Sequence, residues 1–236
     1  MFFKLVFTIF ILSCNNSAIT PLTLENVNLE ISYKDCLLTI EKSRIDFKNQ
    51  YSQGNSEKKQ EVLDSVSIYL ENTIVETIIP YWYGTPWDFN GHTNVPNQGE
   101  IACGYLVSTT LKHVGFNLNR YKFAQQPAMS EAKTLQSTPL KIYRNKSKSE
   151  LVSKVLSELQ DGLYLVGLDN HVGYLQIKNK EVFFIHANYC TNKVEKEQAE
   201  TSACFTSSIY ALGEISTNKE LLKKWILGTT IPIHMD

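Results

Sequence analysis

The chain has 236 residues, 43% of them apolar, which is enough to bury the core of one domain of ordinary size and argues against two full domains. It carries 23 basic and 24 acidic residues, so a formal net charge of −1 gives no overall field that would recruit nucleic acid or an anionic surface. We therefore expect no nucleic-acid partner. We also expect the protein to be a monomer.

The first fourteen residues, MFFKLVFTIFILSC, predict an export signal. Lys4 precedes an apolar run from Leu5 to Leu12 that is too short to span a bilayer and is typical of a secretory signal peptide. Residues 11–14, Ile-Leu-Ser-Cys, resemble the lipobox of bacterial lipoproteins, in which the cysteine becomes the lipidated N-terminus. The alternative is a plain signal peptide cleaved near Ala18.

This reading makes residues 1–14 a signal peptide that ends at a lipidated Cys14, and residues 15–32 a polar tether. It predicts a protein of the bacterial cell envelope, anchored to the membrane by its lipid and facing the periplasm or the surface. Without the lipid, the protein would be secreted.

Two helices are predicted next, over residues 33–50 and 56–79. Gly54 separates them, and Ser56 is the expected N-cap of the second helix. The second helix has the stronger apolar rhythm and is expected to end at Pro80. Both helices form an extension, residues 33–79, of a single domain over residues 33–236.

Residues 85–99 are predicted to form a loop, because prolines and glycines recur throughout this stretch. Loops of this length in compact domains are usually functional or disordered. Trp82, Trp87 and Phe89 argue against disorder and predict a substrate wall, although aromatics packed beneath the loop are the alternative.

Cys103 follows this loop, where a helical pattern begins that Gly115 is expected to end. The helix dipole and free backbone N–H groups of a first turn favour the thiolate, which is the nucleophilic form of cysteine. Position alone is weak evidence, because most free cysteines are buried and inert.

The second half of the chain changes from helical to strand patterns. Cys190 and Cys204 flank a polar loop and are candidates for a disulfide, whereas the spacing of cysteines and histidines suggests no metal site. The predicted elements are a helix over residues 149–159, strands over residues 163–168, 171–177, 182–187 and 208–215, a helix over residues 218–225, and a terminal strand or tail over residues 230–233.

Two histidines are expected to meet on this sheet. His171 begins one predicted strand and His186 lies near the end of the next, and these positions are adjacent when consecutive strands are antiparallel. A cysteine nucleophile needs a base and a third polar group to orient the base, and Cys103, His171 and His186 supply all three. Asn188 competes with His186 for the orienting role, because side chains two residues apart share one face of a strand.

The order of these motifs resembles the NlpC-type cell-wall peptidases, a family of papain-like cysteine hydrolases that cut peptidoglycan stem peptides. The matching motifs are the cysteine at a helix start, a His-Val-Gly strand, a Phe-Ile-His-Ala strand, Pro-Tyr-Trp-Tyr-Gly at residues 80–84 and Asp-Gly-Leu at residues 161–163. The resemblance implies that Cys103 is the nucleophile, His171 the base, His186 the orienting group and Tyr81 a tyrosine near the oxyanion.

The chain differs from the family around the nucleophile, in the segment that recognises the substrate. The family usually has Asp-Cys-Ser-Gly around the nucleophile, whereas residues 102–105 are Ala-Cys-Gly-Tyr. The family's aspartate helps to read the amine of the stem peptide, so we hypothesise that Asp88 or Glu100 replaces it. The predicted substrate-binding residues are Trp82, Trp87, Asp88, Glu100 and Asn188.

The sequence thus predicts an α+β, papain-like domain in which the Cys103 helix packs on an antiparallel sheet of about five strands, preceded by two extra helices. The expected activity is hydrolysis of an amide bond in peptidoglycan without a metal or organic cofactor. The alternatives are an amidase or acyltransferase acting on another amide or lipid, and a non-catalytic envelope lipoprotein that binds through the loop with Trp82 and Trp87.

Overall fold

A computed structural model describes residues 24–136 and 139–235 of the chain. The predicted signal peptide and the lipidated Cys14 lie outside the described residues. The first described helix, α1, spans Leu24–Gln53, so residues 24–32, which we predicted as part of the tether, are helical instead. No helix in the described part of the chain is both long and apolar enough to cross a membrane.

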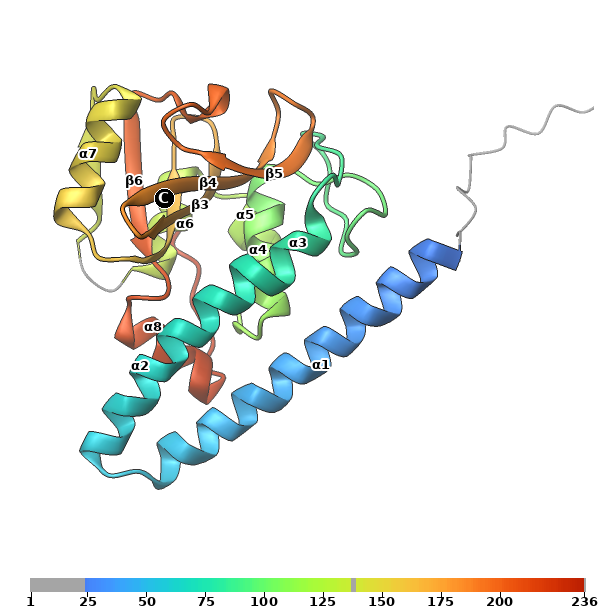
Figure 1. Ribbon diagram of the computed structural model, residues 1–236, viewed down its shortest axis with the longest axis vertical. Helices are drawn as coiled ribbons and strands as arrows, with labels where there is room; N and C mark the ends of the chain where they lie inside the picture. The colour runs from blue at the N-terminus through green and yellow to red at the C-terminus, as the bar shows by residue number, and fades with distance from the viewer. Residues whose placement is uncertain (1–23, 137–138, 236) are drawn as a thin grey trace, which may run out of the picture.

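The α1 helix and α2 (Ser56–Asn72) form a long antiparallel hairpin that extends away from the sheet (Figure 1). The cap of α2 is Asn55 rather than the predicted Ser56, and its side chain accepts a hydrogen bond of 2.9 Å from the Lys58 N–H. One stripe of α2 is buried and provides its contact with the domain; it comprises Val62, Val66 and Leu70.

The expected end of the second helix at Pro80 was wrong. The chain continues from α2 through a π-helical turn, Thr73–Ile78, into α3, Ile79–Trp82. In a regular α-helix, the ring of Pro80 would clash with the carbonyl four residues earlier. Here the wider turn, in which the Ile79 N–H donates to the Ile74 carbonyl, precedes the proline and allows the helix to continue.

The sheet is open, antiparallel and six-stranded, with the order β1-β6-β2-β3-β4-β5, whereas about five strands were expected. Its strands are β1 (Lys141–Arg144), β2 (Gly162–Gly167), β3 (Val172–Lys178), β4 (Glu181–Asn188), β5 (Lys193–Gln198) and β6 (Ile209–Glu214). The patterns for β2, β3, β4 and β6 were recognised correctly, and residues 230–233, predicted as a terminal strand or tail, form a tail.

The edge strand β5 was missed because its sequence, KVEKEQ, reads as a polar loop. Only Val194 of this strand is fully buried, and charged side chains are common on exposed edges, where they prevent pairing with other chains. The sulfur atoms of Cys190 and Cys204 are bonded, so the disulfide that the sequence left open joins the segments before and after this strand.

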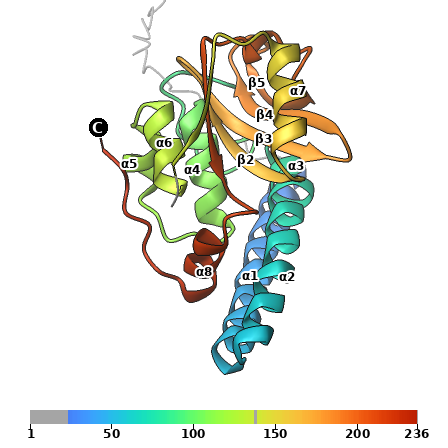
Figure 2. The same cartoon turned by 90° about the vertical axis from the view of Figure 1, so that its left-hand side faces the viewer.

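Helices cover both faces of the sheet (Figure 2). The larger core lies between one face and α4 (Cys103–His113), α6 (Ala128–Leu135) and α8 (Lys219–Leu227), while α7 (Lys148–Glu158) packs against the other face. A short helix, α5 (Arg120–Ala124), lies beside α4. This arrangement places the first turn of α4 beside the start of β3.

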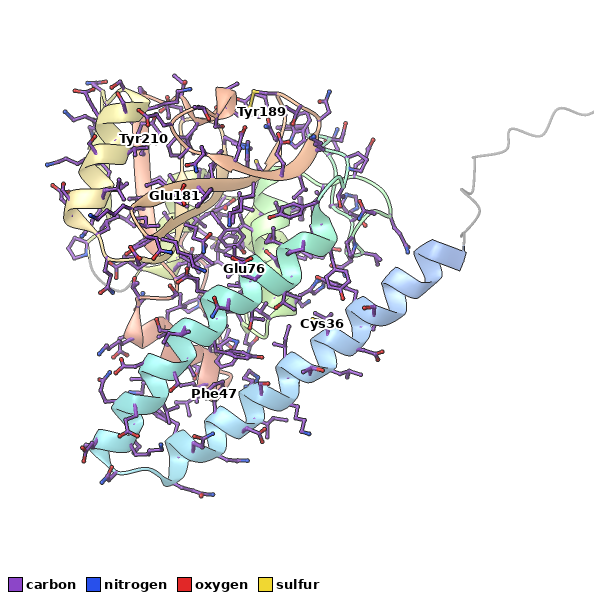
Figure 3. All side chains as sticks on the ribbon, in the orientation of Figure 1. Cys36, Phe47, Glu76, Glu181, Tyr189 and Tyr210 are labelled. Carbon is purple, nitrogen blue, oxygen red and sulfur yellow. A yellow bond between two sulfur atoms is a disulfide. The ribbon has the colours of Figure 1, made fainter. Side chains whose placement is uncertain are left out.

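Trp225 of α8 joins the helical hairpin to the domain. Its ring centroid lies 6.2 Å from that of Phe47 on α1 and 6.0 Å from that of Tyr69 on α2 (Figure 3 labels Phe47). Its indole N–H donates a 2.7 Å hydrogen bond to the carbonyl of Val114, at the end of α4. The hairpin is therefore continuous with the core that carries the Cys103 helix.

We predict that Trp225→Ala lowers the free energy of unfolding by about 3 to 5 kcal/mol, because it removes a fully buried indole and leaves a cavity. Urea denaturation monitored by circular dichroism measures this change. The matched control is Leu38→Ala on α1, whose side chain is 70% exposed, and which should change stability by less than about 0.5 kcal/mol. Equal effects of the two substitutions would show that the hairpin does not depend on Trp225.

Candidate active site

Cys103 is the first residue of α4, as the sequence predicted. The preceding Ala102 is extended, with ψ of 163°, and its N–H is bonded to the carbonyl of Gly91 in the loop. The thiol lies against backbone N–H groups of its own first turn and of Val172, the first residue of β3. Cys103 thus sits where the start of a helix meets the start of a strand.

Burial raises the pKa of the Cys103 thiol to about 11. Loss of solvation is the largest cause, and the nearby Glu131 carboxyl adds to it, while N–H groups of Val172, Gly104 and Cys103 act in the opposite direction. The backbone N–H groups at the helix start do lower the pKa of the thiol, as expected, but burial raises it by more. The resting site therefore holds a neutral thiol at neutral pH.

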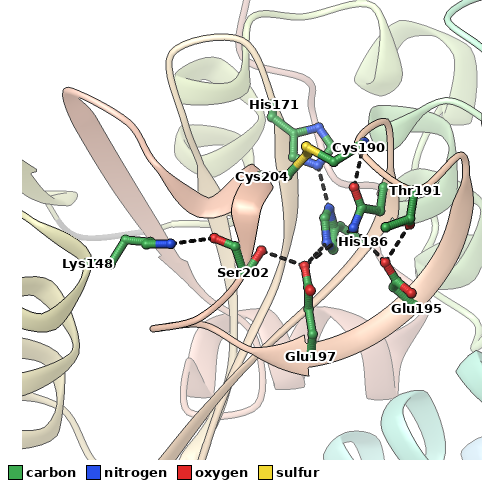
Figure 4. Close-up of a disulfide and its surroundings, with 10 residues drawn as sticks. Lys148, His171, His186, Cys190, Thr191, Glu195, Glu197, Ser202 and Cys204 are labelled. Atoms are coloured by element: carbon green, nitrogen blue, oxygen red, sulfur yellow. Dashed lines mark hydrogen bonds and ion pairs between the residues drawn. A yellow bond between two sulfur atoms is a disulfide. The ribbon is translucent and has the colours of Figure 1, made fainter.

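His171 and His186 are neighbours, as their strand positions predicted. The Nε2 atom of His171 lies 2.7 Å from Nδ1 of His186, and Nε2 of His186 lies 3.0 Å from a carboxylate oxygen of Glu197 on β5 (Figure 4). His171 and His186 are both buried. The site therefore contains a hydrogen-bonded chain of two imidazoles and one carboxylate.

The carboxylate fixes the protonation of both rings. An ionised Glu197 only accepts hydrogen bonds, so Nε2 of His186 carries the proton that points to it, and Nδ1 of neutral His186 is an acceptor. Nε2 of His171 must then donate to that nitrogen. Nδ1 of His171 is consequently left unprotonated, which is the form that a general base requires.

Burial lowers the pKa of both His171 and His186 to about 3. The neighbouring ring lowers the pKa of His171 further, whereas the Glu195 carboxylate opposes the shift at His186. Both imidazoles are therefore neutral at neutral pH, and His171 is available to accept a proton.

Glu197 is held in place by donors on three sides. Besides His186, its Oε1 atom accepts hydrogen bonds from the Ser202 hydroxyl and, at 3.4 Å, from the side-chain amide of Asn188. Ser202 lies two residues before the disulfide-bonded Cys204 (Figure 4). The disulfide thus closes the segment that carries both the carboxylate and one of its donors.

Gly173 makes room for this chain of hydrogen bonds. A Cβ atom at this position would lie 2.7 Å from the ring of Phe184 and 2.9 Å from the Cβ of His186 on the neighbouring strand. The ring of His186 stacks on Phe184 with a centroid distance of 3.9 Å. A larger residue at 173 would displace the ring that orients the base.

Cys103 and His171 both line a cavity of about 480 Å³. Several aromatic side chains line it, and the Tyr189 ring lies between those of His171 and Trp87, with centroid distances of 5.1 Å and 5.9 Å. Arg120 helps to hold the loop wall, because its guanidinium donates to the carbonyls of His92 and Thr93. The aromatic side chains lining the cavity are Trp87, Phe89, His92, Tyr105 and Tyr189.

The predicted substrate residues lie in different parts of the structure. Trp87 belongs to the cavity wall, as predicted. Asn188 is 1% exposed and uses its side chain to support Glu195, Glu197 and the N–H of Cys190, so it serves the carboxylates rather than a substrate.

Two predicted aromatics lie against α1 instead. The Trp82 side chain is completely buried and its N–H donates to the hydroxyl of Tyr33, which excludes it from an open substrate wall. The hydroxyl of Tyr81 is bonded to Ser32, and its ring meets that of Tyr33 at 5.1 Å. The role of Tyr81 near an oxyanion therefore has no support from its contacts.

The two acidic candidates lie in the loop. The Asp88 carboxylate accepts the N–H of Asn90, two residues further on, which is a local turn contact. Glu100 is exposed at the end of the loop, where its carbonyl accepts the N–H of Thr93. Neither contact brings a carboxylate to Cys103.

Three functional candidates were missed: Tyr189, Glu197 and Glu131. Tyr189 follows β4 directly and could have been found by extending that strand by one residue. Glu197 was hidden in the unrecognised edge strand, and Glu131 lies on α6 within a segment of weak pattern. Among the described residues, no group of three or more histidines, cysteines and carboxylates is arranged to hold a metal ion.

Comparisons of the chain with protein-family models, with curated proteins and with solved structures found no match. The case for a function consequently rests on the geometry of Cys103, the two histidines and Glu197.

We predict that alkylation of Cys103 by iodoacetamide is slow at pH 7 and rises about tenfold per pH unit up to pH 10, because the thiolate fraction grows until the pH reaches a pKa of about 11. The rate is read from the Cys103 peptide by mass spectrometry, with Cys36→Ser protein as the sample. The same protein unfolded in urea is the reference and should react faster at pH 7. A rate that is already maximal below pH 7 would show a preformed thiolate instead.

Proposed function

We propose that this protein is a cysteine hydrolase that cleaves an amide bond, with peptidoglycan stem peptides as the substrate. The observation that carries this proposal is the hydrogen-bonded chain from Glu197 through His186 to His171, which leaves Nδ1 of His171 unprotonated on a residue that lines the same cavity as Cys103.

In the proposed reaction, His171 accepts the thiol proton while the sulfur of Cys103 attacks the amide carbonyl carbon. The two charges form together, so their attraction offsets part of the cost of forming each one in a buried site. The carbonyl oxygen becomes an oxyanion, which N–H groups at the start of α4 stabilise.

The tetrahedral intermediate then collapses. His171 returns its proton to the leaving nitrogen, the C–N bond breaks, and an acyl group remains on Cys103. Water, deprotonated by His171, adds to this thioester; the C–S bond then breaks, the acid is released, and the proton on His171 returns to the sulfur of Cys103. His186 and Glu197 touch neither substrate nor sulfur in this scheme; they hold His171 in the required tautomer.

The finer fold assignment is part of the same proposal. A cysteine at a helix start, packed against an antiparallel sheet that carries the base, is consistent with the papain-like arrangement of the NlpC-type family. Export to the bacterial cell envelope and a lipid on Cys14 would bring such an enzyme to peptidoglycan. These inferences come from the sequence motifs.

The aromatic cavity favours one alternative within the same chemistry. Phe89 is 78% exposed at the cavity, and Ala102 stands where the related peptidases carry an aspartate. Such a wall suits an apolar or flat group better than a charged one. The second candidate is therefore an amidase or acyltransferase that acts on an amide with an apolar acyl group.

We predict that the purified protein releases peptide fragments from peptidoglycan and that Cys103→Ala abolishes this release, because no other group replaces the nucleophile. Mass spectrometry of the soluble products identifies the bond that is cut. Cys36→Ala is the matched control and should retain full activity, since Cys36 lies on α1 (Figure 3). Equal release by the Cys103→Ala protein would refute the proposal, and release from N-acyl amides alone would favour the alternative.

We further predict that Glu197→Gln lowers kcat by about 10- to 100-fold with little change in KM, because it weakens the group that orients the base without touching the cavity. Glu195→Gln is the matched control, since Glu195 lies two residues away on β5 but bonds to Asn188 and Thr191. It should cost less than about threefold in kcat. Equal losses in the two variants would remove the specific role of Glu197.

A further inference from the structure

A second cavity, of about 210 Å³, adjoins Cys103 on the side of α6. Cys103 and His171 line it together with Glu131, a residue that the proposed mechanism does not use. It is smaller than the first cavity, and its lining includes the polar side chains of Gln126, Asp169 and Asn170. A substrate carbonyl held at Cys103 would have access to both cavities.

Glu131 is a buried carboxyl that lacks a partner for one of its oxygens. Its side chain is 2% exposed, and among the described residues Oε2 of Glu131 is one of the few buried polar atoms without a hydrogen bond. Native proteins rarely leave such an atom unsatisfied, because it loses its hydrogen bonds to water without replacing them. The unused oxygen therefore points to a ligand that supplies the missing partner.

Gly104 brings this carboxyl close to the nucleophile. A Cβ atom at residue 104 would lie 2.7 Å from Oε1 of Glu131, so only glycine lets the carboxyl rest against the first turn of α4. Glu131 also lies close enough to Cys103 to raise the pKa of its thiol. The carboxyl thus lies against the same first turn of α4 whose N–H groups are assigned to the oxyanion in the proposed reaction.

Burial favours the uncharged form of the Glu131 carboxyl. Burial raises its pKa well above the ordinary value, and no cation is among the residues that line the cavity. Asp169, in the same lining, shows the opposite behaviour: hydrogen bonds from the backbone and side chain of Ser208 lower its pKa. The pKa values of the two carboxyls in this cavity are therefore shifted in opposite directions, by burial at Glu131 and by hydrogen bonds at Asp169.

We propose that Glu131 is a catalytic residue whose protonated carboxyl donates a hydrogen bond to the carbonyl oxygen of the substrate and stabilises the oxyanion at Cys103. No proton is transferred in this step; the O–H of Glu131 finds the acceptor that it lacks in the free protein. The inference rests on the proposed function and extends it, because it assigns an oxyanion donor on α6 in addition to the N–H groups of α4.

Two variants separate a neutral donor from the other roles. Glu131→Gln keeps a hydrogen-bond donor of similar size but cannot ionise, whereas Glu131→Met keeps the size and removes the donor. We expect Glu131→Met to lower kcat by about 100-fold and Glu131→Gln by less than about tenfold. If both variants remain folded and lose activity equally, Glu131 acts as an anion. If both keep full activity, Glu131 is structural. Either result overturns the proposal.

Two measurements do not depend on turnover. Infrared spectra at pH 7 should show the C=O band of a protonated carboxylic acid that disappears in Glu131→Gln; absence of the band overturns the proposal. N-acetylalaninal, a small amido aldehyde, adds to the thiol of Cys103 to give a hemithioacetal whose oxygen mimics the oxyanion. Its Kd should rise at least tenfold in Glu131→Met and less than about threefold in Glu131→Gln.

These measurements also distinguish failure of the proposed function from failure of this inference. If peptidoglycan is not cut but the aldehyde binds with the expected order of affinities, the hydrolase proposal fails and the donor role of Glu131 stands. If peptidoglycan is cut by a Cys103-dependent activity and the aldehyde binds equally to both Glu131 variants, the donor role fails alone.

Discussion

The hydrogen bond between the two buried histidines is the contact on which the rest of the site depends. It spans 2.7 Å between neighbouring strands, and it has a defined direction only because a carboxylate on a third strand accepts from the far side of His186. Without that acceptor, either nitrogen of His186 could carry the proton, and His171 would be free to present the wrong tautomer to the cavity.

Much of the surrounding structure holds the hydrogen-bonded series of His171, His186 and Glu197 in place. Pairing of β4 with β5 sets Glu197 diagonal to His186, the absence of a side chain at Gly173 leaves room for the ring, and a disulfide closes the segment after the carboxylate. On the other side of the sheet, the helical hairpin and α8 fix α4, which fixes Cys103. The position of a single proton therefore depends on contacts spread over the whole domain.

Burial gives the site a particular chemical character. It raises the pKa of the thiol and lowers that of the imidazoles, so the resting site is neutral instead of being a stored ion pair. In the proposed reaction, charge would form at this site only when a bound substrate carbonyl accepts it. The neutral carboxyl of Glu131 belongs to the same arrangement, because a buried donor stabilises charge strongly where water is excluded.

The sequence by itself determined the elements that have strong local patterns. The helix that starts at Cys103, the four apolar strands and the meeting of His171 with His186 all follow from periodicity and from the antiparallel order of consecutive strands. These features depend on residues close together in the chain, so a single sequence is enough to reveal them.

Only the tertiary structure decided the features that depend on distant residues. The edge strand β5 has too few buried side chains to show a pattern, so Glu197 could not be recognised before its neighbour strand was known. Glu131 lies 28 positions after Cys103, and its pKa depends on its burial in the folded protein. Tyr81 and Trp82 matched a motif, yet their partner is α1, which the motif does not contain. Burial and long-range contact are properties of the folded chain, and these set the pKa values and partners on which the chemistry depends.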